Sequence, residues 1–217
     1  MIKTLKNVRP QSLGEEIANS ISHGLGLIAA IVAAPFLLVA AIHQGSPWTI
    51  VGASVFAASM VILYLSSTLY HAAYQPRLKR VFHYFDHIAI YILIAGTYTP
   101  FTLGVLRGVT GWIIFGLIWG LAVFGIILKA VAGPKRLPVL STVLYLGMGW
   151  LVVLAARPLL QHMPIAGLWW LLAGGIAYSA GVVAYAATRY RYAHFIWHLF
   201  VIAGTMCHFV AIIRYAI

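Results

Sequence analysis

Long apolar runs separated by short polar gaps dominate the chain. After a polar start, each run is close to the ~20 residues that an α-helix needs to cross the hydrocarbon core of a bilayer. The runs lie at 20–42, 47–72, 84–106, 110–131, 138–157, 166–187 and 195–215. The gaps are too short to hold separate domains. The pattern predicts an all-α integral membrane protein, with an N-terminal segment 1–18 followed by a seven-helix transmembrane domain 19–217.

The composition supports this class of protein. Of the 217 residues, 63% are hydrophobic and 8% are charged, and the mean hydropathy is +0.96. A soluble domain of this size could not cover its surface with so few charges. The single cysteine, Cys207, excludes an internal disulfide and a thiolate-rich metal site. Any metal must therefore rely on histidine and carboxylate ligands.

The cationic residues orient the predicted helices. The formal net charge is +11, but Lys and Arg lie in the short gaps, where they favour one membrane orientation rather than nucleic-acid binding. Three of the fourteen, Arg107, Arg157 and Arg214, fall on the side opposite the N-terminus. The other eleven are Lys3, Lys6, Arg9, Arg77, Lys79, Arg80, Lys129, Lys135, Arg136, Arg189 and Arg191. Because cationic loops stay in the cytoplasm, we expect a cytoplasmic N-terminus, an extracytoplasmic C-terminus and a multi-pass location in the cytoplasmic (inner) cell membrane.

Small residues recur at helix-packing intervals. Gly116 and Gly120 in one run, and Gly174 and Gly181 in another, predict faces on which helices approach closely. Membrane lipids are the expected surroundings of such a bundle. The sequence leaves the formation of a homo-oligomer open.

Polar residues that are rare in membrane spans gather at one predicted depth. His71 ends the second run, with Ser67 one helical turn before it, and Asp86 lies about one turn into the third run. His194 and His198 begin the seventh run. All five are therefore expected near the cytoplasmic side. Asp86 is the only acidic residue after the N-terminal segment, and a lone carboxylate inside a span is expected to be partnered or functional.

This arrangement predicts a zinc site. Residues i and i+4 share a helix face about 6 Å apart, so His194 and His198 could ligate one ion, and His71 is the best-placed third ligand. Three histidines with an open fourth position are typical of a zinc site that keeps a water molecule. Zinc lowers the pKa of such a water to about 7. Asp86, supported by the Ser67 hydroxyl, is placed to orient that water or accept its proton.

Other interpretations of the histidines stay open. An i,i+4 histidine pair at a membrane interface also occurs simply as the polar face of an amphipathic helix. His83 and His87 form a second such pair beside Asp86, either as ligands or as interfacial residues in contact with lipid headgroups. His208 follows His198 by nearly three helical turns, about 15 Å along the axis. It cannot share that metal and is expected to hydrogen-bond to another helix.

Four stretches together resemble one family. They are EEIANSISHG at 15–24, SSTLYH at 66–71, FDHIAIYILIAGTYTPF at 85–101 and HFIWHLFVIAGTMCH at 194–208. In this order they resemble the hemolysin III proteins of bacteria, the prokaryotic branch of the progestin and adiponectin receptor superfamily. The resemblance spans nearly the whole chain.

The resemblance implies a zinc site on the cytoplasmic side. The S-x-x-x-H motif of that superfamily corresponds to Ser67 and His71, its downstream Asp to Asp86, and its H-x-x-x-H motif to His194 and His198. An E-x-x-N-x-x-x-H pattern also lies near the start of the first helix. Helix capping is the alternative role for the first two of its residues, which are Glu16, Asn19 and His23.

Three functions from different classes follow from these observations. The first is a zinc-dependent hydrolase of a lipid amide or ester, as a wider resemblance to the alkaline ceramidases implies. The second is a non-enzymatic, receptor-like protein in which zinc is structural. The third is a cytolysin, which the family name implies, but a chain this apolar has no evident soluble form. We expect a zinc-binding protein of membrane lipid and energetic homeostasis, with hydrolase activity left open.

Overall fold

The computed structural model describes residues 9–133 and 136–217, and it is helical in almost all of this length. The segment predicted at 1–18 is thus described only from Arg9 onward, and Lys3, Lys6 and Lys135 of the charge analysis lie outside the described residues. The helices are α1 (Leu13–Gln44), α2 (Pro47–Ala72), α3 (Pro76–Leu103), α4 (Val109–Ala132), α5 (Pro138–Trp150), the 3-10 turn η1 (Leu151–Ala155), α6 (Ala156–His162), α7 (Ile165–Ala186) and α8 (Ala193–Tyr215).

Several helices begin earlier than the apolar runs predicted. α1 begins at Leu13 because Ser12 and Glu15 form a capping box, in which the Ser12 backbone N–H donates to the Glu15 carboxylate at 2.9 Å. α3 begins at Pro76, where the fixed φ of proline suits the first helical turn. These polar first turns extend the helices beyond their apolar parts, so hydrophobicity alone places the boundaries too late.

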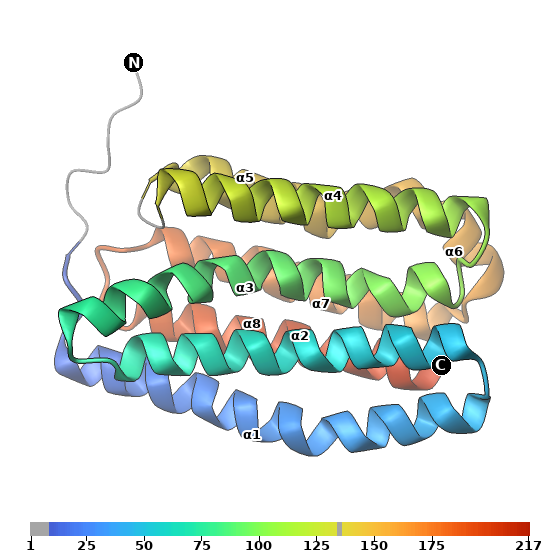
Figure 1. Cartoon of the computed structure of the whole chain (residues 1–217), viewed down its shortest axis with the longest axis horizontal. Helices are drawn as coiled ribbons and strands as arrows, with labels where there is room; N and C mark the ends of the chain where they lie inside the picture. The colour runs from blue at the N-terminus through green and yellow to red at the C-terminus, as the bar shows by residue number, and fades with distance from the viewer. Residues whose placement is uncertain (1–8, 134–135) are drawn as a thin grey trace.

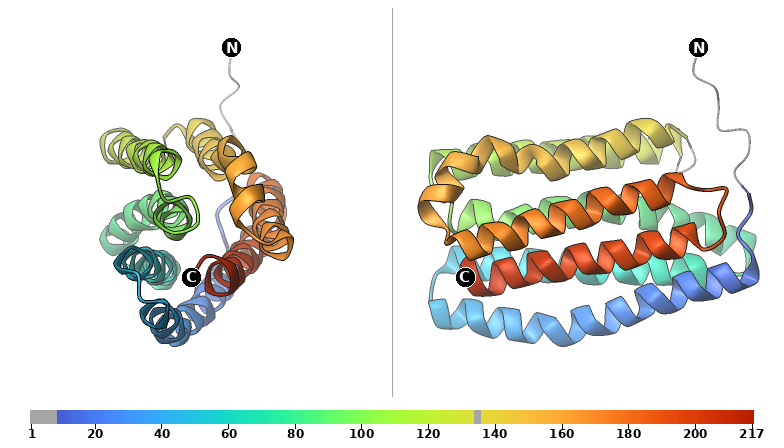
Figure 2. Two further views of the ribbon diagram at one scale, coloured as in Figure 1. Left: turned by 90° about the vertical axis from the view of Figure 1, so that its right-hand side faces the viewer. Right: turned by 180° about the vertical axis from the view of Figure 1, so that it is seen from behind.

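The helices form a closed ring in chain order. Each long helix packs against the next, and α8 returns to pack against α1. The end-on view in Figure 2 shows this ring, and Figure 1 shows the helices lying side by side along one axis. The chain continues from α5 through η1 into α6, which turns away from the axis of α5 at the right-hand end of the bundle in Figure 1. Because successive helices alternate in direction, α1, α3 and α8 begin at the same end of the bundle as the end of α2.

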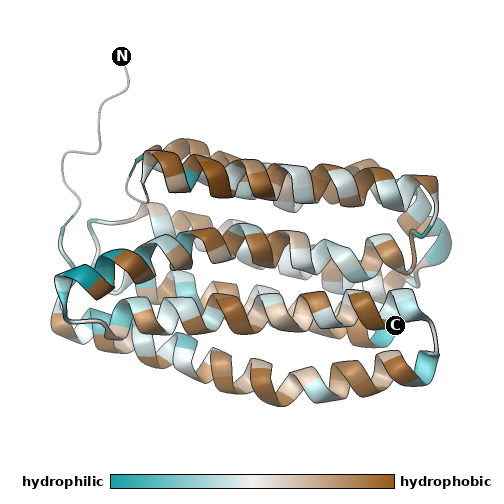
Figure 3. Ribbon diagram, viewed as in Figure 1, coloured by the Kyte–Doolittle hydropathy of each residue, from teal (hydrophilic) through white to brown (hydrophobic). Residues whose placement is uncertain are grey.

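The outer surface is that of a membrane protein. Among the residues that the structure describes, six segments are long and apolar enough to cross a bilayer: α1, α2, α4, the combined α5–α6 segment, α7 and α8. α3 runs beside α2 in the bundle, but its first turns are polar, as the teal residues in Figure 3 show. The multi-span membrane class is therefore confirmed, whereas a count of seven spans and the sidedness of the termini remain predictions.

Glycines bring some of these helices into very close contact. A Cβ atom at Gly52 would lie 2.8 Å from the Pro100 backbone, so the crossing of α2 and α3 at this point requires glycine. Gly174 and Gly181 likewise face side chains of α8, as the small-residue pattern predicted. The prediction for Gly116 and Gly120 is wrong within the part of the chain that the structure describes, where nothing lies within 4 Å of a Cβ at either position. Both lie on a face of α4 that points away from the bundle.

Candidate metal centre

Three histidines from two helices meet at one end of the bundle. His71 lies in the last turn of α2, and His194 and His198 lie in the first turns of α8. One ring nitrogen of each lies within 4.8 Å of the others. Zinc–nitrogen bonds of about 2.1 Å place tetrahedral donor atoms about 3.4 Å apart. Small rotations of the imidazole rings would therefore suffice to enclose one ion.

The helix directions explain why these histidines meet. α2 ends where α8 begins, so the C-terminal turn of one helix and the N-terminal turns of the other lie at the same depth. Within α8, the four-residue spacing places His194 and His198 on one face, with ring centroids 4.7 Å apart. The His71 ring lies 5.2 Å from that of His194 and 5.0 Å from that of His198. The predicted set of three is thus brought together.

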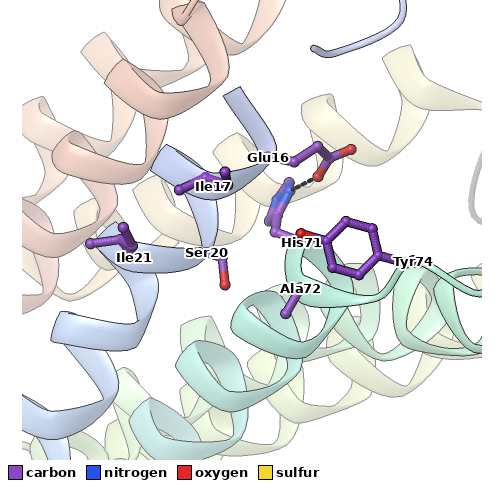
Figure 4. A pocket seen from close by; sticks show the side chains of 7 residues that line it. All are labelled: Glu16, Ile17, Ser20, Ile21, His71, Ala72 and Tyr74. Atoms are coloured by element: carbon purple, nitrogen blue, oxygen red, sulfur yellow. Dashed lines mark hydrogen bonds and ion pairs between the residues drawn. The ribbon is translucent and has the colours of Figure 1, made fainter. Parts of the chain in front are cut away.

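The first turns of α1 support the His71 ring. The His71 Nδ1 atom lies 2.8 Å from a carboxylate oxygen of Glu16. The other oxygen of Glu16 lies 3.0 Å from the ammonium group of Lys79 on α3. Figure 4 shows the pair of Glu16 and His71 at a pocket of about 150 Å³ between α1 and α2. The pocket lining also includes Ile17, Ser20, Ile21, Ala72 and Tyr74.

The His198 ring is supported by the same helix. Its Nδ1 atom lies 3.2 Å from the backbone carbonyl oxygen of Asn19 and 3.1 Å from the hydroxyl oxygen of Ser22. The Ser22 hydroxyl in turn donates to that carbonyl at 2.9 Å. A carbonyl oxygen only accepts hydrogen bonds, so the His198 Nδ1 atom must carry the proton. The lone pair of His198 therefore lies on Nε2.

The residues present fit a bound metal ion. With Nδ1 of His71 donating to a carboxylate, the lone pair of His71 also lies on Nε2. That Nε2 atom is buried and has no hydrogen-bond partner among the described residues. Metal-ligating histidines usually donate their other ring N–H to a carboxylate or carbonyl group, as both rings do here.

Asp86 and Ser67 lie near His71, but outside the group that could ligate one ion. Asp86, on α3, interacts electrostatically with His71 and lies close to the Ser67 hydroxyl. Ser67 is 1% exposed, and its hydroxyl makes no hydrogen bond of ordinary geometry to any residue that the structure describes. Their roles toward a metal-bound water stay predictions.

The remaining histidines lie outside the cluster. His83 and His87 pack against each other on α3, and the His83 ring stacks on Tyr70 with centroids 4.6 Å apart. His208 contacts the Leu171 carbonyl oxygen of α7 through Nε2 at 3.3 Å, consistent with the predicted interhelical hydrogen bond.

The E-x-x-N-x-x-x-H pattern belongs to this site rather than to a helix cap. Glu15 caps α1, and it also pairs with Arg9 and accepts the Tyr192 backbone N–H at 2.8 Å. Glu16 and Asn19 face the histidine cluster instead. His23 is 3% exposed and stacks on His198, with centroids 3.5 Å apart. Spacings of three and four residues on one helix face were the available signal, but the sequence did not show what that face contacts.

Fold and site together define a polytopic helical membrane protein with a buried histidine cluster at its more cationic end. Comparison with known proteins gives the family. The model of the family described as "Haemolysin-III related" matches residues 11–209, and the chain belongs to that family. The resemblance to hemolysin III proteins seen in the motifs is thereby confirmed.

Three relatives illustrate the range of the similarity. The chain is 43% identical to the "Hemolysin-3 homolog" of Bacillus subtilis (strain 168), over 95% of this chain and 96% of the relative. It is 42% identical to "Hemolysin-3" of Bacillus cereus, over 95% of this chain and 94% of the relative. The human "Monocyte to macrophage differentiation factor" is 29% identical, over 93% of this chain and 84% of the relative.

Proposed function

We propose that this protein binds zinc through His71, His194 and His198 and hydrolyses an amide or ester bond of a membrane lipid, acting in membrane lipid homeostasis. One observation carries the proposal. The three imidazoles form a set of three nitrogen donors, while the carboxylates of Glu16 and Asp86 lie outside that set. Three protein ligands and an open position are the arrangement of catalytic rather than structural zinc sites.

The chain supplies the groups that hydrolysis needs. When bound, zinc acts as a Lewis acid and lowers the pKa of a coordinated water to about 7. Asp86 would accept a proton beside the metal, and the Ser67 hydroxyl would hold the Asp86 carboxylate in place. Lipid substrates suit this position, because α2 and α8, which carry the cluster, and α1 beside them expose apolar residues on their outer faces.

Lipid analysis of cells tests the proposal. Cells with the wild-type gene, cells without it, and cells with His198→Ala are compared by mass spectrometry of extracted lipids. His208→Ala is the matched control, because it removes an imidazole from the same helix but not from the cluster. We expect a hydrolysis product with the wild type and with His208→Ala, and none with His198→Ala. The same product in cells with the wild type, with His208→Ala and with His198→Ala would refute the proposal.

Structural zinc is the second candidate, favoured by a different observation. The three histidines come from α2 and α8, and two of them form hydrogen bonds to α1. One bound ion would therefore hold three helices together. Purified protein that holds zinc but yields no lipid product in any membrane composition would support this role. Cytolysis, which the relatives' names suggest, would instead appear as dye release from vesicles.

A further inference from the structure

We propose that Glu16 is a positioning residue of the metal centre: its carboxylate holds the His71 ring so that Nε2, and not Nδ1, faces the ion. The backbone carbonyl of Asn19 and the hydroxyl of Ser22 do the same for His198. We call Glu16, Asn19 and Ser22 the α1 polar row. The inference rests on the zinc centre of the proposed function. It adds a role for the helix that supplies none of the predicted ligands.

The geometry of the α1 polar row follows from helical spacing. Each step of three residues turns the side-chain direction by about 60° around an α-helix, so the row Glu16, Asn19 and Ser22 sweeps across the inner side of α1. α1 packs against both α2 and α8, the two helices that carry the histidines. The Glu16 carboxylate therefore reaches His71 on α2, while the Asn19 backbone carbonyl and the Ser22 hydroxyl reach His198 on α8. α1 therefore orients the imidazole rings of two ligands that lie on other helices.

Glu16 is the strongest member of the row. An imidazole can rotate by half a turn about its Cβ–Cγ bond and offer either nitrogen to a metal. The hydrogen bond from Nδ1–H to a carboxylate is charge-assisted, and its length of 2.8 Å is typical of such bonds. It stabilises the orientation with Nε2 toward the cluster. It also makes the imidazole a more basic ligand, and such outer partners contribute about 10- to 100-fold to metal affinity.

The surroundings of Glu16 favour the charged form of its side chain. The Glu16 side chain is 21% exposed, whereas the His71 side chain is 1% exposed. Lys79 balances the charge at the other carboxylate oxygen of Glu16, and its ammonium group also donates to the Tyr70 carbonyl oxygen at 3.2 Å. Glu16 lines a pocket and stays partly exposed, while the Nε2 atom of His71 is buried. A charged group can therefore act on the buried ligand without itself being fully buried.

Zinc titration of the full chain in lipid nanodiscs tests the inference. Zinc is titrated against a chelator of known affinity, for the wild type, Glu16→Gln and Glu16→Ala. The amide oxygen of Gln can accept the hydrogen bond but lacks the charge. We expect the zinc dissociation constant to rise about tenfold for Glu16→Gln and about 100-fold for Glu16→Ala.

Glu15→Gln is the matched control for a merely structural effect. Glu15 is the preceding residue and also a carboxylate, but it caps α1 and contacts Arg9 and Tyr192 instead of the cluster. We expect Glu15→Gln to lower the thermal stability of the metal-free protein and to change zinc affinity less than about threefold. Glu16→Gln should show the opposite pattern.

The ring orientation gives a second readout that a structural role would not change. In protein labelled with 15N in its histidine rings, the His71 signals of the zinc-loaded wild type should be those of a protonated Nδ1 and a metal-bound Nε2. Glu16→Ala should add a population bound through Nδ1. Unchanged zinc affinity and unchanged signals in Glu16→Ala would overturn the role of Glu16 while leaving the zinc centre intact. A wild-type protein that binds no zinc would instead refute the proposed function first.

Discussion

Single side chains decide whether the cluster holds a metal. Replacing His71, His194 or His198 by Ala removes one of three nitrogen donors, and two imidazoles on rigid helices bind zinc far more weakly than three. We expect each variant to lose most of the zinc that the purified wild-type protein carries, measured by plasma mass spectrometry. His83→Ala is the control, because His83 lies outside the group of three and packs on Tyr70.

The result can also reject this set of ligands. If His83→Ala and His87→Ala emptied the site while His194→Ala left it full, the metal would bind at the second histidine pair on α3. The outcome matters because both pairs have the same four-residue spacing in the sequence.

A substitution of Asp86 tests whether this residue is a metal ligand or a proton acceptor. Asp86→Asn keeps the shape and hydrogen-bonding capacity of the side chain but removes the charge that would accept a proton. We expect zinc to be mostly retained, with affinity lowered about 10- to 100-fold, as for other outer-shell changes. Hydrolytic activity, measured on the lipid product, should fall by roughly two to four orders of magnitude. Zinc loss as complete as in His198→Ala would make Asp86 a ligand and favour a structural zinc site.

The close packing of some helix pairs depends on a few glycines at which the two backbones nearly touch. At Gly52, a methyl group would meet the Pro100 backbone at 2.8 Å, and a backbone atom cannot rotate away as a side chain can. We expect Gly52→Ala to push α2 and α3 apart and to destabilise the protein by about 1–3 kcal/mol, the usual range for overpacking. Thermal unfolding in detergent, followed by intrinsic fluorescence, measures the effect.

Gly116→Ala is the matched control at the level of the helix. It makes the same chemical change in α4 at a position where no described atom lies within 4 Å of the new Cβ. Its melting temperature should equal or slightly exceed that of the wild type, because Ala stabilises a helix interior relative to Gly. Equal losses in both variants would show that the contact between Gly52 and Pro100 does not limit stability.

The bundle as a whole has an uneven distribution of cations between its two ends, which predicts a membrane orientation that a fusion experiment can test. The ends of the described helices place Arg107, Arg157 and Arg214 at the end away from the cluster of three histidines, and the other described cations at the end that holds the cluster. Because cationic loops remain in the cytoplasm, we expect the end of α8 to face outward. Alkaline phosphatase fused after Ile217 should be active, and green fluorescent protein fused there should be dark. The reverse result would refute the seven-span prediction.

The sequence was sufficient for the features that depend on local composition. Runs of apolar residues predicted the membrane class and the approximate helices, because each span must satisfy its own backbone hydrogen bonds and expose apolar side chains to lipid. The order of the helices and their alternating direction then placed His71 near His194 and His198. The predicted histidine cluster followed from these facts and from the spacing of four residues in α8.

Only the tertiary structure decided what each polar side chain contacts. Adjacent carboxylates, Glu15 and Glu16, look equivalent in the sequence, but one caps its own helix and the other holds His71, 55 positions away. The carbonyl of Asn19 meets His198 at a separation of 179 positions. Likewise, Gly116 has the spacing of a packing residue but faces outward. The reason is physical: periodicity fixes which residues share a helix face, whereas the partner of that face is set by how the ring of helices closes.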